Sequence, residues 1–304
     1  MCRPDYKHYD TMDSISDNGQ TYDEEAGANT GLQAPSTTSA LWLDDLRNYL
    51  SSNDMVEVCC CLFFYGLVHA IFMVGGFTVH LRPMPVQQVD DNLYIENQQF
   101  GYEYQGETVP GEYNKYFLMV PLLVQLFLSL ILPSLRNNRD WHKTLCVYVV
   151  SSALCDGITQ AIKLYVGYFR PVFFSLCQPS EDYSECTTGG HGPRTSFPSS
   201  HSSMSFVNSV LLMLFLHCKF GIPTQRRYVK VCDANDDIYY QPVYTQTSMR
   251  ARFCTLLSIL PVLWATFVAC SRVVDNMHAP VDILAGCVIG SSIAYGVHNM
   301  WFAY

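Results

Sequence analysis

The sequence predicts an all-α fold, a multi-pass bundle of six transmembrane helices. Of the 304 residues, 49% are hydrophobic and only 15% are charged. Several uninterrupted apolar runs are long enough to cross a hydrocarbon core about 30 Å thick. A soluble two-domain protein would have to bury all of these runs as core helices, so we favour the membrane interpretation.

The N-terminal 40 residues are rich in Asp, Ser, Thr, Gly and Asn and show no hydrophobic periodicity. Such a composition predicts a disordered tail over 1–40. Much of the net charge of −9 comes from residues 1–55, where ten acids face three basic residues. This acidity does not bear on nucleic-acid binding, and we expect no nucleic-acid partner. No basic region with a short apolar core begins the chain, so we expect the first span to direct membrane insertion.

Residues 41–52 form an amphipathic segment before the first apolar run. Its apolar side chains recur on one helical face, namely Trp42, Leu43, Leu46, Tyr49 and Leu50. This stripe predicts an interfacial helix lying on the membrane. A short helix packed against the spans is an equally good interpretation.

The apolar runs over 56–300 predict one six-span domain. The expected spans are 56–79, 116–134, 144–169, 203–221, 252–271 and 280–300. Basic residues gather in the loops after the second and fourth spans, whereas the loop at 80–115 has two basic residues and six acids. Basic loops stay cytoplasmic, and six spans place both termini on the same side of the membrane as these two loops. We therefore expect both termini on the cytoplasmic side.

Three polar clusters stand at the ends of spans on the opposite, non-cytoplasmic face. In the first, Lys163 and Arg170 are seven residues apart, which predicts one helical face and a separation of about 10 Å. Pro171 should leave Arg170 at the mouth of that helix. The second is the hydroxyl-rich turn 197–203 around His201, and the third is the segment 271–282.

The three clusters predict an anion site. Cations near a bilayer are costly unless they face a polar cavity, and three together, Lys163, Arg170 and Arg272, would repel one another without an anion. Phosphate is the commonest anion with several oxygens. Taken singly, each cation is more often a headgroup anchor, and the serines could simply cap a helix. Their joint occurrence favours the site.

The histidines suggest the chemistry. His278 precedes Asp282 by four residues at a helix start, so its ring can donate to that carboxylate and use the other nitrogen as a nucleophile. A structural His–Asp pair is the alternative. His201 would serve as general acid. The three cations, with Ser199 and Ser200 at the head of the fourth span, would hold the phosphate oxygens. No metal is required by this arrangement.

Three motifs resemble the signatures of the type 2 phosphatidic acid phosphatases, or lipid phosphate phosphatases. They are Lys-x6-Arg-Pro at 163–171, Pro-Ser-x-His at 198–201 and Ser-Arg-x5-His-x3-Asp at 271–282. The resemblance covers 56–300. It implies an enzyme that dephosphorylates phosphatidate, lysophosphatidate, sphingoid-base phosphates or diacylglycerol pyrophosphate. The implied reaction proceeds through a phosphohistidine and needs neither Mg²⁺ nor another cofactor. The resemblance implies the same role for each residue named above. We expect the protein in the plasma membrane or an endomembrane, with the site on the extracellular or lumenal face.

Two positions depart from the family pattern. Ser200 stands where the family usually has Gly, and Tyr168-Phe169 replaces a basic residue before Arg170. These departures keep an alternative open, a regulatory membrane protein that binds a lipid phosphate without turnover.

The chain has 13 cysteines, most of which lie inside apolar runs as small hydrophobes. Cys177 and Cys186 instead share the non-cytoplasmic loop between the third and fourth spans. A disulfide between them is our hypothesis.

Overall fold

The computed structural model describes residues 53–90, 93–137, 139–220, 227–232, 238–243 and 249–302. The predicted tail over 1–40 and the predicted interfacial helix over 41–52 lie outside these residues. Within the described ranges, six helical segments are long and apolar enough to cross a membrane. The predicted all-α, six-span fold is therefore confirmed.

The spans begin and end within five residues of their predicted positions, except that the first ends at Phe72 and not at residue 79. Among the described residues they are Asn53–Phe72, Gly111–Ile131, Asp140–Val166, Ser200–Phe220, Met249–Val274 and Pro280–Phe302. As helices they are α2 (Asn53–Val74), α3 (Asn114–Ile131), α5 (Asp140–Val166), α7 (Ser200–Phe220), α8 (Met249–Ser258) with α9 (Leu260–Val274), and α10 (Pro280–Phe302). The fifth span is divided next to Pro261, which α9 carries in its first turn.

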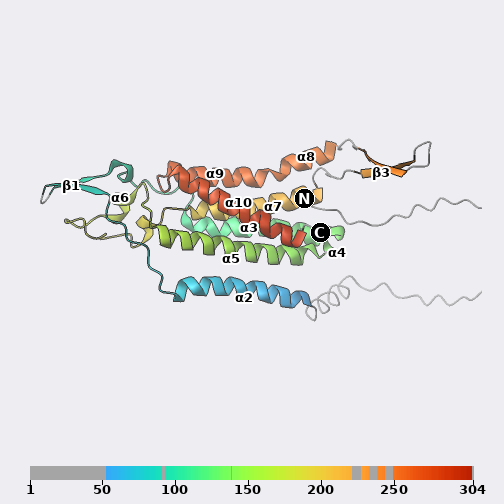
Figure 1. Ribbon diagram of the computed structural model, residues 1–304, viewed down its shortest axis with the longest axis horizontal. Helices are drawn as coiled ribbons and strands as arrows, with labels where there is room; N and C mark the ends of the chain where they lie inside the picture. The colour runs from blue at the N-terminus through green and yellow to red at the C-terminus, as the bar shows by residue number, and fades with distance from the viewer. Residues whose placement is uncertain are drawn as a thin grey trace, which may run out of the picture.

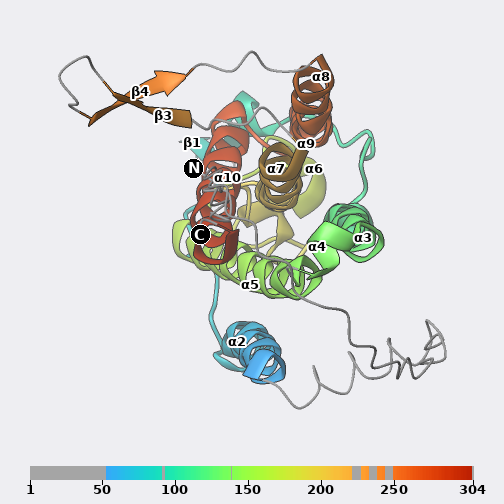
Figure 2. The ribbon, with the colours of Figure 1, turned by 90° about the vertical axis from the view of Figure 1, so that its right-hand side faces the viewer.

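Helix α7 is the centre of the bundle and contacts α3, α5, α8, α9 and α10. Viewed along the helices, these elements surround it, whereas α2 stands at the edge and packs on α5 (Figure 2). The apolar core lies between α5, α7 and α10, with Tyr148, Phe215 and Val297 fully or almost fully buried. Most of α2 is left to face lipid.

Two glycines of α10 bring it close to α7. A Cβ atom on Gly286 would lie 2.7 Å from the Ser199 carbonyl oxygen, and one on Gly290 would collide with the Ser203 carbonyl oxygen. Such small-xxx-small spacing is typical of membrane helices whose backbones approach closely. Since His201 lies on α7 and Asp282 on α10, this approach sets their separation.

The connections gather at the two ends of the bundle (Figure 1). One end carries the hairpin β1 (Val86–Asp90) and β2 (Leu93–Glu96), the short helix α6 (Phe173–Cys177) and the 3-10 turns Gln98–Phe100, Gly111–Tyr113 and Gly192–Arg194. The other end carries α4 (Pro133–Asn137) and the hairpin β3 (Arg227–Cys232) and β4 (Ile238–Val243). Each hairpin is antiparallel, and neither is predicted by the sequence pattern.

One local prediction is wrong. Lys163 and Arg170 do not share a helical face, because α5 ends at Val166 and Gly167 takes a left-handed conformation with φ of 57°. Glycine adopts this conformation without a Cβ penalty and commonly ends helices. The chain therefore turns between the two cations, and Arg170 approaches from a loop.

Candidate active site

The predicted site residues lie at the end of the bundle where β1, β2 and α6 gather. Because successive spans run in opposite directions, the last turn of α5, the first turn of α7, the last turn of α9 and the first turn of α10 meet there (Figure 1). These turns carry Lys163, His201, Arg272 and Asp282 respectively. The loops between them supply Arg170, Ser199 and His278.

His278 is held by a carboxylate and a hydroxyl on one side of its ring. Nδ1 lies 3.6 Å from Asp282 Oδ2 and 3.4 Å from Ser196 Oγ. The Ser196 hydroxyl donates to Asp282 Oδ2 at 2.5 Å, and the Ala279 N–H donates to the same oxygen at 3.0 Å. Asp282 is thereby fixed, and Nε2 of His278 is the ring nitrogen turned away from it.

Lys163 and Arg170 bond to main-chain carbonyls. Lys163 Nζ donates to the Thr195 carbonyl at 2.5 Å, and Arg170 Nε donates to the Gly192 carbonyl at 2.9 Å. A second Arg170 nitrogen lies 3.4 Å from the Met277 carbonyl oxygen. Because carbonyl oxygens carry no formal charge, these bonds hold both side chains in place without pairing them with an anion.

Arg272 is fully buried and is covered by the loop between α2 and α3. One guanidinium nitrogen donates to the Val109 carbonyl at 2.5 Å and lies 3.4 Å from Asp275 Oδ2. The other lies 3.4 Å from Glu107 Oε1. Asp275 also accepts from the Thr108 N–H at 2.9 Å, which ties the covering loop to the end of α9.

His201 is oriented from the same loop. A ring N–H of His201 donates to the Pro110 carbonyl, and Phe117 packs edge-on to the ring at 6.3 Å. Its Nε2 is buried with no hydrogen-bond partner among the described residues. A buried imidazole nitrogen without a partner is available for a ligand or for proton transfer.

Ser199 caps the start of α7. Its hydroxyl accepts from the Ser202 N–H at 3.4 Å, and its own N–H donates to the Asp282 carbonyl at 3.0 Å. Ser200, the first residue of α7, is half-buried. The head of this helix therefore presents N–H groups toward the cluster, as helix N-termini that bind anions do.

The sequence comparisons identify the family. The model described as the PAP2 superfamily matches residues 144–304, more than half of the chain. The chain belongs to the PAP2 superfamily. The matched region contains all the residues predicted for the site.

Relatives of this PAP2 chain carry names that agree with the family. A "Putative phosphatidate phosphatase" of Drosophila melanogaster is 30% identical, over 77% of this chain and 67% of its own length. "Lipid phosphate phosphatase 2" of Arabidopsis thaliana is 29% identical, over 66% and 64%. "Diacylglycerol pyrophosphate phosphatase 1" of Saccharomyces cerevisiae is 27% identical, over 62% of each. The chain thus spans about two thirds of these relatives' length. No solved structure matches it.

Burial and neighbouring charges shift the pKa values of residues in the PAP2 site. Burial lowers the pKa of His278 well below its usual value, and the positive charges of Arg170, Lys163 and Arg272 lower it further. Burial likewise lowers the pKa of Arg170 to about 10, with Arg272 adding to the effect. His278 is therefore neutral near pH 7 while Arg170 stays charged, the combination that a nitrogen nucleophile in an anion site needs.

Sequence reasoning did not identify Ser196, Glu107 and Asp275 as neighbours of the PAP2 site. Ser196 lies just before the second motif and contacts both His278 and Asp282. Asp275 lies within the third motif, three residues after Arg272, and this spacing was an available signal. Nothing in the sequence around Glu107 marks it as a partner of Arg272, since 165 residues separate the two.

The outer loop of the PAP2 site contains the predicted cysteine pair. Cys177 and Cys186 are joined by a disulfide. Beside it, Arg194 stacks on the rings of Phe169 and Phe173 and donates to the Arg82 carbonyl at 2.7 Å. Burial lowers the pKa of Arg194. The loop that carries Arg170 is thus packed against aromatic rings and cross-linked behind the site.

Proposed function

We propose that this protein is a lipid phosphate phosphatase. It hydrolyses phosphatidate and related lipid phosphomonoesters or pyrophosphates, including lysophosphatidate, sphingoid-base phosphates and diacylglycerol pyrophosphate, without Mg²⁺. Membership of the PAP2 superfamily and the names of the relatives support this activity. The single observation that carries the mechanism is His278 with its Nδ1 facing Asp282 and Ser196, next to Lys163, Arg170 and Arg272, which lower its pKa.

In the first step, His278 Nε2 attacks the phosphorus atom. The P–Nε2 bond forms as the bond from phosphorus to the lipid oxygen breaks. Asp282 accepts the Nδ1–H, which fixes the tautomer and stabilises the positive charge that develops on the ring. Ser196 keeps Asp282 in position through its 2.5 Å hydrogen bond.

The negative charge of the bound phosphate offsets the nearby cations, so His201 enters the step protonated on both ring nitrogens, with one N–H on the Pro110 carbonyl. Its Nε2 proton goes to the departing lipid alkoxide, or to the departing lipid phosphate when the substrate is a pyrophosphate. In the second step the same nitrogen takes a proton from water, whose oxygen attacks the phosphohistidine. The P–N bond then breaks and inorganic phosphate leaves. The absence of a protein partner for this nitrogen, among the described residues, supports its assignment.

Lys163, Arg170 and Arg272 bind the nonbridging phosphate oxygens, together with the Ser199 hydroxyl and the N–H groups at the head of α7, beginning at Ser200. The cations are already positioned, so little reorganisation accompanies the redistribution of charge in the transition state. These steps use protein groups and water alone.

The proposed membrane arrangement follows from the distribution of basic residues. Residues 56–300 form one phosphatase domain with both termini cytoplasmic, and the site opens on the extracellular or lumenal face. The basic loops after the second and fourth spans lie at the end of the bundle opposite the site (Figure 1). This arrangement supports a plasma-membrane or endomembrane enzyme.

Phosphate release from phosphatidate and diacylglycerol pyrophosphate, measured on detergent-purified protein in excess EDTA, tests the proposal. We expect release that survives chelation and disappears in His278→Ala. His298→Ala is the matched control, because His298 is equally buried but lies near the far end of α10, the helix that begins two residues after His278. That variant should stay active.

A folded wild-type protein that releases no phosphate from any of these lipids would contradict the enzyme. Binding of lipid phosphate without turnover would instead support the regulatory alternative, to which Ser200 and Tyr168-Phe169 point.

A further inference from the structure

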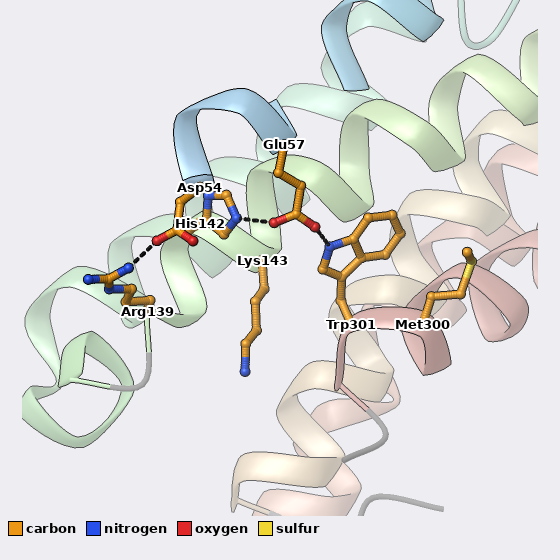
Figure 3. A pocket seen from close by; sticks show the side chains of 7 residues that line it. All are labelled: Asp54, Glu57, Arg139, His142, Lys143, Met300 and Trp301. Atoms are coloured by element: carbon orange, nitrogen blue, oxygen red, sulfur yellow. Dashed lines mark hydrogen bonds and ion pairs between the residues drawn. The ribbon is translucent and has the colours of Figure 1, made fainter. Parts of the chain in front are cut away.

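A second cluster of polar side chains lies at the end of the bundle away from the candidate active site. It borders a pocket of about 500 Å³ between the start of α2, the start of α5 and the end of α10 (Figure 3). The lining residues are Asp54, Glu57, Arg139, His142, Lys143, Met300 and Trp301. Just behind it lie two cysteines, Cys61 and Cys146.

Three donor atoms in this cluster converge on one point. His142 Nε2 lies 2.7 Å from Glu57 Oε2 and 3.8 Å from Cys146 Sγ. The donor atoms of these three residues all lie within 4.8 Å of one another. Glu57 Oε1 is held separately by the indole N–H of Trp301 at 2.7 Å, as Figure 3 shows. One carboxylate oxygen is therefore positioned by Trp301 while the other faces the cluster.

The two helices contribute donors with the same spacing. Glu57 and Cys61 are four residues apart on α2, and His142 and Cys146 are four residues apart on α5. Residues with this spacing lie on one face of a helix. The thiol of Cys61 interacts with that of Cys146 across the two helices. Cys61 is not one of the three donors that lie within 4.8 Å of one another, but its thiol is the neighbouring group that completes a set of four.

We propose that Glu57, Cys61, His142 and Cys146 form a binding site for a divalent zinc ion. Zinc takes four ligands from carboxylate, imidazole and thiolate at about 2.0–2.3 Å, which places an N and an S ligand roughly 3.6 Å apart. The 3.8 Å between His142 Nε2 and Cys146 Sγ matches that separation. Two thiol donors select against Mg²⁺ and Ca²⁺, which prefer oxygen.

The observed 2.7 Å contact between Glu57 and His142 is a hydrogen bond that shares one proton. Zinc would replace that proton, and the two atoms would separate to about 3.4 Å in a tetrahedral site. Binding also releases the thiol protons of Cys61 and Cys146 to solvent. The site with zinc bound would carry a net charge of −1. The neighbouring cations Arg139 and Lys143 lie beside Asp54 and Asp140, respectively.

Access and burial both suit a resident ion. The Glu57 side chain is 42% exposed at the pocket, which gives zinc a route in, whereas the His142 side chain is 5% exposed. Cys146 is fully buried. Bound zinc would join α2 to α5, the helix on which α2 packs. The ion is thus expected to be structural, because four protein ligands leave no position open for a substrate.

Metal analysis of the full-length chain tests the site. Detergent-purified protein is incubated with Zn²⁺, desalted, and its zinc measured by mass spectrometry. We expect about one zinc per chain, and roughly a tenth of that in the double variant Cys61→Ser/Cys146→Ser. The matched control is Cys59→Ser/Cys60→Ser, since these neighbouring thiols of α2 are exposed. Cys155→Ser controls for loss of a buried thiol on α5. Both controls should keep their zinc.

Cobalt provides a measurement on the wild type that does not depend on a variant folding. Co²⁺ bound by thiolates absorbs through a sulfur-to-metal charge-transfer band, so Co²⁺ should produce that band and Zn²⁺ should abolish it. Three results would overturn the proposal: no band and no zinc in the folded wild type, equal zinc in the Cys61→Ser/Cys146→Ser variant, or a disulfide between Cys61 and Cys146 in the purified protein.

Discussion

The two ends of the helical bundle differ in the partners of their basic side chains. At the end opposite the candidate active site, basic side chains are paired with carboxylates: Lys219 lies 3.0 Å from Asp140, and Arg139 pairs with Asp54. At the site end, Lys163 and Arg170 are held by main-chain carbonyls. Carbonyls fix the position of a cation and leave its charge in place. The comparison distinguishes ion pairs that support the fold from cations that have no carboxylate partner and are positioned to bind an anionic ligand.

Arg272 is the exception at the site end, because it faces Glu107 and Asp275. Both contacts are 3.4 Å long, and Glu107 comes from a loop between spans rather than from the bundle. A phosphate oxygen would compete with Glu107 for the same guanidinium. The sharpest way to examine the difference between the ends is to change matched residues at each.

After His278→Ala, the largest effect should come from His201→Ala. If His201 protonates the leaving group, its loss should slow hydrolysis of an alkyl phosphate such as phosphatidate by roughly 10²–10⁴-fold. A nitrophenyl phosphate ester should lose much less, because nitrophenolate leaves without protonation. Release of the leaving group in the first turnover on both substrates measures the ratio, because the second step, in which His201 activates water, is common to both. His217, also on α7 but at its far end, provides the control variant His217→Ala. Equal losses on the two substrates would contradict the acid role.

The next effect compares an arginine from each end. Arg272→Gln should lower kcat/KM for phosphatidate by about 10²–10³-fold, the usual cost of removing one preorganised transition-state donor. Arg139→Gln breaks an ion pair whose arginine side chain is 54% exposed, so stability should change by about 0–1 kcal/mol and activity should not change. Melting temperatures are measured alongside. Wild-type activity in a folded Arg272→Gln protein would remove Arg272 from the proposed phosphate site.

Much of the fold was predictable because a bilayer constrains sequence so strongly. Each span had to be an apolar run, so its existence and approximate ends followed from composition and length. Alternation of the spans then predicted that Lys163, His201, Arg272 and Asp282 would meet at one end, and the structure places them there. These inferences needed no knowledge of side-chain contacts.

The remaining details depend on local conformation and on long-range contacts. The helix end at Gly167 separates Lys163 from Arg170, and a seven-residue spacing cannot reveal a left-handed residue between them. The Val109 carbonyl reaches Arg272 across 163 residues, and no periodic pattern links a loop to a buried side chain. The close approach of α7 and α10 was available as Gly286 and Gly290, four residues apart on one helix.

A smaller effect compares two glycines of α10. Gly290→Ala would push a methyl group into the Ser203 carbonyl and the Val207 N–H of α7, whereas Gly296→Ala meets nothing within 4 Å. We expect Gly290→Ala to destabilise the protein by about 1–3 kcal/mol, the usual cost of overpacking. Gly296→Ala should leave the melting temperature unchanged or raise it, since Ala favours helix over Gly. Thermal unfolding in detergent measures both. A Gly290→Ala protein as stable as Gly296→Ala would show that the helices can separate at no cost.

The smallest effect is a pH dependence of stability that His278 should produce. Burial and three cations lower its pKa in the folded state, while the unfolded chain keeps a value of about 6.5. Below that pH the unfolded state binds a proton that the folded state does not, so stability falls as pH falls from about 6.5 toward the folded-state value. One pH unit below 6.5, the loss is about 1.4 kcal/mol.

Melting temperatures from pH 7.5 to 5.5 should therefore fall more steeply for the wild type than for His278→Gln, which cannot titrate. The control His191→Gln changes a histidine exposed in the outer loop and should follow the wild type. Parallel slopes for the wild type and His278→Gln would mean that His278 is not held neutral by the site, and the proposed nucleophile would lose its electrostatic support.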